Sequence, residues 1–146
     1  MKNLLLNPTL ALLLTFVLIS GAVTAKKQQL YGKWKMVSGK TNGLPNPAVA
    51  HDRTWEFTKD FWFKGVVFIN NQLRPFNQGI YMLPNDTTLV TIHADNHGNL
   101  SKIAYTYNYV IKKDTLNIYG FYMANINDNP GMLQLMYIEE KWAKIK

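Results

Sequence analysis

The chain has 146 residues, a formal net charge of +7, an aromatic content of 13% and no cysteine. This length suits one domain with a sizeable core. The lack of cysteine excludes a disulfide framework, a cysteine nucleophile and the lipidated cysteine of a bacterial lipoprotein. The lysines are scattered along the chain and form no basic run, which indicates solvated strand faces and no nucleic-acid partner.

The first 25 residues have the features of a secretory signal peptide. Lys2 precedes the apolar run LALLLTFVLIS, and Val23-Thr24-Ala25 forms a small-residue cleavage site. We predict cleavage before Lys26, which leaves one domain over residues 26–146 with a net charge of +6, because Lys2 is lost with the leader. The alternative is an uncleaved anchor helix, although the run is short for a membrane span. We therefore expect an exported bacterial protein, periplasmic or extracellular, that is not a lipoprotein and keeps no stable membrane span after cleavage.

Residues 26–146 are typical of short β-strands separated by turns, with no long amphipathic helix. Gly, Pro, Asn and Asp mark the turns, and most runs are spaced as hairpins, which predicts antiparallel order. A longer loop, GKTNGLPNPAVA, follows the first strand. The eight predicted strands cover residues 33–38, 53–58, 61–69, 74–83, 88–93, 100–111, 115–123 and 133–144.

Apolar and polar residues alternate along several of these strands. The aromatic residues of WEF (55–57) share one face, as do the tyrosines of YTYNY (105–109) and the first, third and fifth residues of IEEKW (138–142). A period of two gives each strand one buried and one solvated side. Eight such strands can close into a barrel around one small ligand, and closure removes exposed edges. We predict an all-β fold, a single eight-stranded antiparallel up-and-down β-barrel, with a two-sheet sandwich as the alternative.

The first predicted strand opens with LYGKWKMVSGK, in which Gly32 and Trp34 form a Gly-x-Trp. Glycine permits close backbone approach where a barrel strand turns inward. A tryptophan two residues later points to the same side and can close that end, provided that its indole N–H finds a partner. We predict that Gly32 and Trp34 form a structural plug at one barrel end.

Three segments, LYGKWKMVSGK, WEFTKDFWF and YIEEKWAKIK, follow one another over Leu30–Lys146. In this order they resemble the lipocalin/calycin superfamily, and more narrowly the short lipocalin-like domains of Bacteroidetes-type exported proteins. The resemblance implies a lipocalin-like barrel with a ligand in its interior. It also implies that a basic residue of the last strand, Lys144 or Lys141, packs across Trp34. The missing disulfides argue against the hormone and odorant carriers of animals.

Aromatic side chains on the inner faces are the candidate walls of a pocket, because tyrosine offers apolar surface and a hydroxyl that orients a ligand. Glu140 shares the inner face of the last strand and must be paired or it will protonate. Arg53 or Arg74 is the expected partner, and the alternative places Glu140 at a wet barrel end. A filled interior with no pocket is a further alternative. The predicted ligand-binding residues are Trp55, Phe57, Phe63, Tyr105, Tyr107, Tyr109, Tyr119 and Glu140, with Phe61 as a further wall residue.

Other chemistries find little support. His51, His93 and His97 lack the spacing of a metal site. The segment 125–131 lacks the glutamate of a calcium loop and is typical of a plain hairpin turn. Glu139 is adjacent to Glu140 and points to the other face of the strand, so the two cannot act as a carboxylate pair. We predict no metal, no cofactor and no catalytic residue.

The sequence therefore predicts non-catalytic binding of a small hydrophobic or amphipathic ligand inside the barrel. One alternative is a filled barrel that acts as a protein-binding or inhibitor module at the cell envelope, with the loop Gly39–Ala50 as its contact. An enzyme of unrecognised type is another alternative. The identity of the ligand and the oligomeric state stay open.

Overall fold

The computed structural model describes residues 30–46, 52–126 and 129–146. The predicted signal peptide and its cleavage site, together with His51, lie outside these ranges. The described residues are almost entirely β-structure. The strands are β1 (Gly32–Thr41), β2 (Leu44–Pro45), β3 (Thr54–Phe57), β4 (Trp62–Ile69), β5 (Gln72–Met82), β6 (Thr88–Ala94), β7 (Leu100–Lys112), β8 (Thr115–Ile126) and β9 (Asn129–Ile145).

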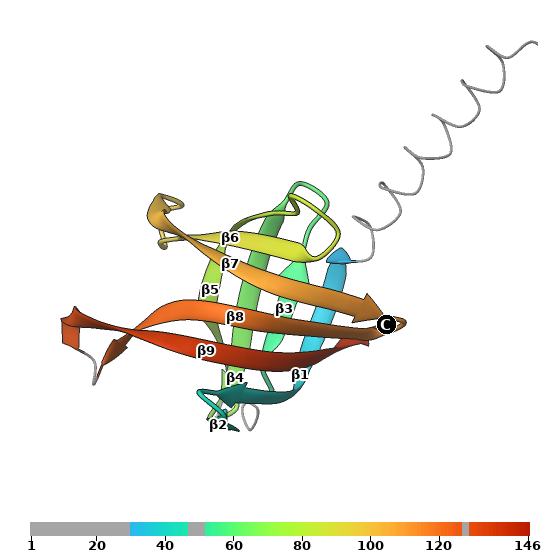
Figure 1. Ribbon diagram of the computed structural model, residues 1–146, viewed down its shortest axis with the longest axis horizontal. Helices are drawn as coiled ribbons and strands as arrows, with labels where there is room; N and C mark the ends of the chain where they lie inside the picture. The colour runs from blue at the N-terminus through green and yellow to red at the C-terminus, as the bar shows by residue number, and fades with distance from the viewer. Residues whose placement is uncertain (1–29, 47–51, 127–128) are drawn as a thin grey trace, which may run out of the picture.

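Eight of the strands form a closed antiparallel barrel. The order is β1-β3-β4-β5-β6-β7-β8-β9, and β9 pairs with β1 to close the ring (Figure 1). The β1–β9 register runs from Lys33↔Ile145 to Thr41↔Ile138, with a bulge between Met36 and Ser38. The predicted up-and-down barrel is confirmed, and the two-sheet sandwich was wrong. The two-residue strand β2, which was predicted as loop, is an extra strand that pairs only with the end of β1.

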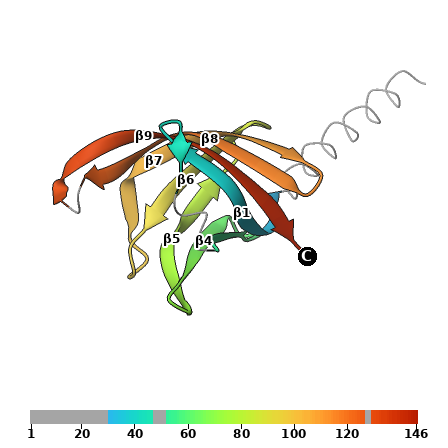
Figure 2. The same cartoon turned by 90° about the horizontal axis from the view of Figure 1, so that it is seen from below.

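The turns alternate between two ends of the barrel because every strand runs antiparallel to its neighbours. One end, called here the closed end, holds the start of β1 and the turns at residues 58–61, 83–87 and 113–114. The other, called the open end, holds the β4–β5, β6–β7 and β8–β9 hairpins, which spread apart (Figure 2). In the β4–β5 hairpin Asn70 and Asn71 have φ of 51° and 60°, the geometry that a tight I′ turn needs and that asparagine tolerates.

The Gly-x-Trp plugs the closed end as predicted. Trp34 has no exposed surface, and its Nε1 donates a hydrogen bond of 2.8 Å to the carbonyl oxygen of Leu30. The Lys144 Nζ lies 5.1 Å from the centre of the Trp34 ring, so the basic residue of the last strand is Lys144 and not Lys141. Gly32 has a φ of +122°, and a Cβ there would meet the Lys144 side chain at 3.2 Å. The positive φ therefore requires glycine, whereas the flexible end of Lys144 could move aside for a Cβ.

A single aromatic-rich core fills the closed end and the middle of the barrel. Trp55 on β3 stacks on Trp142 on β9, with ring centres 5.0 Å apart and planes at 16°. Phe57 meets both Trp55 and Tyr81 edge to face, at 5.5 and 5.1 Å. The inner faces predicted for β3, β7 and β9 are confirmed. This packing leaves the open end as the place where the interior is hollow.

Candidate functional site

A cavity of about 470 Å³ lies inside the barrel above the aromatic core. Its volume falls in the range of small-molecule sites. Residues of every barrel strand from β3 to β9 line it, its floor is the aromatic core, and its mouth is at the open end. Its walls include Trp55, Phe76, His93, Tyr105, Tyr107 and Tyr122, and its polar groups include Arg53, Asn77 and Glu140.

Half of the residues predicted to bind ligand line this cavity, namely Trp55, Tyr105, Tyr107 and Glu140. The structure places the other predicted residues elsewhere. Phe57, Phe63 and Tyr109 point inward but are buried in the core closer to the closed end. They support the cavity without lining it.

Two of the predicted wall residues do not face the interior. Phe61 lies in the turn before β4, where it is 46% exposed and packs on Tyr81 at 5.6 Å. Tyr119 lies on the outer face of β8, because its neighbours Ile118 and Gly120 are the buried ones. It lines a shallow outer cavity of about 590 Å³ beside Lys40. Neither side chain can reach a ligand inside the barrel.

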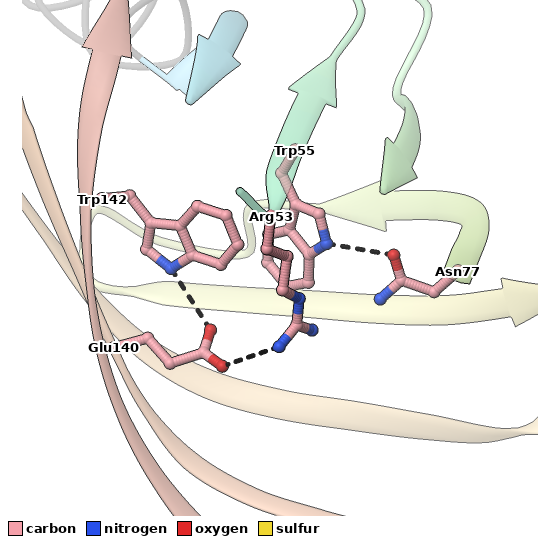
Figure 3. Close-up of polar contacts among 5 residues, drawn as sticks. All are labelled: Arg53, Trp55, Asn77, Glu140 and Trp142. Carbon is pink, nitrogen blue, oxygen red and sulfur yellow. Dashed lines mark hydrogen bonds and ion pairs between the residues drawn. The ribbon is translucent and has the colours of Figure 1, made fainter. Parts of the chain in front are cut away.

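The predicted internal ion pair is present, and its cation is Arg53. Its Nη1 lies 3.3 Å from Glu140 Oε1, and Trp142 Nε1 donates a 3.2 Å hydrogen bond to Glu140 Oε2 (Figure 3). The Glu140 side chain is 2% exposed and that of Arg53 is 16% exposed. The alternatives, an Arg74 partner or a wet barrel end, were wrong, since Arg74 is exposed on β5.

Burial pulls both partners of this pair toward their neutral forms. It raises the pKa of Glu140, while the Arg53 charge and the Trp142 hydrogen bond act in the opposite direction. Burial likewise lowers the pKa of Arg53, while Glu140 acts to raise it. The contact between the two groups offsets only part of this effect of burial, and either partner alone would be costly to bury.

Aromatic rings surround the Arg53 guanidinium. Its Cζ lies 4.0 Å from the centre of the Phe76 ring and about equally far, 5.8 and 5.7 Å, from Trp55 and Trp142. Such contacts favour a cation that has lost its water. The Nε of Arg53 is buried and has no hydrogen-bond partner. This N–H is therefore shielded from the cavity as well as from solvent.

Phe76 and Asn77 of β5 are site residues that the sequence did not reveal. Asn77 Oδ1 accepts a 3.0 Å hydrogen bond from Trp55 Nε1 and so orients the indole at the cavity wall. The two side chains fit only because β4 has a glycine opposite them. A Cβ on Gly65 would lie 2.0 Å from Asn77 Oδ1 and 2.3 Å from the Phe76 ring. A glycine within an otherwise apolar strand is the signal that could have predicted such close packing.

His93 on β6 is the third ionisable group of note in the cavity wall. Its ring packs between Phe63 and Tyr105, at 5.5 and 5.0 Å. Burial and, to a smaller extent, the charge of Arg53 lower its pKa below the ordinary 6.5, so the ring is neutral at pH 7. Within the described residues no three His, Asp or Glu side chains gather as a metal site.

Comparisons with models of known protein families and with curated proteins found no match. The part of the chain that the structure describes contains no helix with the length and hydrophobicity to cross a membrane. The site must therefore be interpreted from its own chemistry. It combines aromatic walls, one internal ion pair and a mouth at the open end, and its volume leaves room for a small molecule.

Proposed function

We propose that this protein binds a small hydrophobic or amphipathic molecule inside its barrel, without catalysis, as a carrier of the lipocalin type. The observation that carries the proposal is the cavity of about 470 Å³, walled by aromatic side chains above a sealed barrel end. Apolar burial would supply the affinity, at roughly 25 cal/mol per Å² before the costs of ordering. The tyrosine hydroxyls and the Arg53–Glu140 pair would supply selectivity.

The leader-like residues 1–25 support a second part of the proposal, export to the periplasm or the medium. The Trp34 plug with Lys144 across its ring supports the lipocalin-type assignment. Measuring the mass of the protein after expression in a bacterium tests export, because cleavage before Lys26 gives a defined mass. An intact chain of 146 residues would contradict cleavage.

Uptake of the neutral dye Nile red tests ligand binding directly. Val67 lines the cavity, whereas the next residue, Phe68, is 40% exposed on the outer face of the same strand. We expect Val67→Trp to place an indole in the space that the dye needs and so to weaken dye uptake at least about tenfold, since a small-molecule site holds its ligand by enclosing most of the ligand surface. The matched control Phe68→Trp adds an indole outside the barrel and should leave uptake unchanged. Equal uptake by the two variants would refute binding in this cavity.

A second candidate function, binding of a protein partner through the outer surface, is favoured by one observation. The far ends of β8 and β9 extend beyond the rest of the barrel (Figure 1) and carry Phe121, Leu133 and Leu135 with more than half of each side chain exposed. Part of the loop Gly39–Ala50, the contact expected from the sequence, lies outside the described residues. Native mass spectrometry separates the two functions, because a bound small molecule and a co-isolated protein give different masses.

A further inference from the structure

We infer that the cavity selects an uncharged molecule carrying a carbonyl-type acceptor, such as an ester, ketone or amide, over an ionised carboxylate. The acceptor oxygen would meet the Nη groups of Arg53 at the cavity wall. This inference rests on the proposed function and narrows its ligand class.

The first argument is unused donor capacity. A guanidinium carries five N–H donors. At Arg53, Nη1 reaches Glu140 and Nε is fully buried, while the side chain as a whole is 16% exposed and lines the cavity, so a ligand can meet only its Nη groups. Because a hydrogen bond to a charged donor contributes more than one between neutral groups, a ligand oxygen at these groups gains affinity.

The second argument is charge. The Arg53 cation is already paired with Glu140, 3.3 Å away, so the pair as a whole carries no net charge that could attract an ionised ligand. His93 is neutral at pH 7, and burial raises the pKa values of Tyr107 and Tyr122, which keeps both phenols neutral. Among the described cavity residues, Arg53 is thus the one cation at neutral pH.

A ligand carboxylate would be a second anion on that single cation. It would lose its water without gaining a free countercharge, and the Glu140 carboxylate would repel it. An ester or ketone oxygen has no charge to desolvate and can still accept from the guanidinium. The cavity therefore favours the neutral acceptor.

Three matched probes test this selectivity at pH 7: dodecanoic acid, its methyl ester and dodecane. Each is titrated against the Nile red complex, with tryptophan fluorescence as a second readout, since Trp55 lines the cavity and Trp142 stacks on it. The ester should bind about tenfold more tightly than the hydrocarbon, as expected for one hydrogen bond to a charged donor. It should also bind more tightly than the acid.

Replacing Glu140 by glutamine makes the test sharper. Glu140→Gln keeps the size and an oxygen acceptor for Trp142 but removes the negative charge, so Arg53 becomes a free cation and the acid should overtake the ester. The control Glu139→Gln alters the neighbouring exposed carboxylate. It should leave the ester bound more tightly than both the hydrocarbon and the acid. If Glu140→Gln does not fold, Arg53→Met/Glu140→Leu removes both charges and should abolish the preference of the ester over the hydrocarbon.

The outcomes separate this inference from the function on which it rests. Tightest binding of the acid by the unaltered protein, or an unchanged ranking in Glu140→Gln, overturns the inference and leaves ligand binding intact. Retention of the ester preference by the double variant also overturns it. No uptake of Nile red and no response to any probe overturns the proposed function itself.

Discussion

Replacing Arg53 by methionine tests how much the internal ion pair stabilises the barrel. The variant keeps an apolar stem against Phe76 but leaves the Glu140 carboxylate, which is 2% exposed, without its cation. Breaking a buried pair on one side costs about 3–5 kcal/mol. Trp142 still donates to Glu140, and the carboxylate can take up a proton, so we expect the lower part of that range, about 3 kcal/mol.

Removing both charges should restore most of this stability. Exchange of a buried pair for apolar side chains of similar size is often neutral or stabilising. One cost remains in Arg53→Met/Glu140→Leu, because the buried Trp142 indole N–H loses its acceptor, which is unfavourable by about 1–3 kcal/mol. We therefore expect the double variant to be about 1 kcal/mol less stable than the unaltered protein and about 2 kcal/mol more stable than Arg53→Met.

Urea unfolding followed by tryptophan fluorescence at pH 7 measures these differences as shifts of the midpoint. The exposed Lys33–Glu56 pair, at 3.6 Å with 60% and 45% exposure, provides a control, and Lys33→Met should change stability by less than about 1 kcal/mol. Glu140→Leu is the second single variant of the cycle. A double variant whose loss of stability equals the sum of the losses in Arg53→Met and Glu140→Leu would refute the reasoning, because additivity means that Arg53 and Glu140 do not interact.

Three further changes test other parts of the structure. Gly65→Ala forces a Cβ to within 2.3 Å of the Phe76 ring and should cost about 1–3 kcal/mol in urea unfolding, with weaker uptake of Nile red. Trp34→Phe loses the hydrogen bond to Leu30 and leaves a void at the closed end, so the free energy of unfolding should fall by about 2 kcal/mol, and an unchanged thermal midpoint would contradict the plug. Burial lowers the pKa of His93 below 6.5, so its contribution to stability is fully present above pH 6.5 and is lost as the pH falls from there through the lowered pKa of the folded protein. His93→Phe should therefore lose less stability than the unaltered protein when urea midpoints are compared across that window, and equal losses would contradict this assignment.

The barrel could be predicted from the sequence because its strands are short, alternating and separated by clear turn residues. Period-two patterning gives the face of each side chain, and this was correct for β3, β7 and β9. It does not give the height of a side chain along the barrel axis. Phe57, Phe63 and Tyr109 were therefore assigned to the pocket, although they lie below it in the core.

Tyr119 shows where patterning becomes ambiguous. The segment LNIYGFY (116–122) carries apolar or aromatic residues on both faces, so alternation alone does not say which set is buried. The buried set is Leu116, Ile118 and Gly120, and Tyr119 faces outward. The pair Arg53–Glu140 was predictable for a different reason, because a carboxylate on an inner face demands a cation and the chain offers only two arginines.

The pairing of β1 with β9 has a consequence for how the protein comes to be folded. It joins the first strand of the described chain to the last, so the contact order is high and the ring cannot close until Ile145 has been synthesised. A chain that stops before β9 would leave β1 and β8 as edge strands with unpaired backbone groups, which can pair with other chains. Loss of only the C-terminal segment should therefore yield an aggregating polypeptide instead of a smaller barrel.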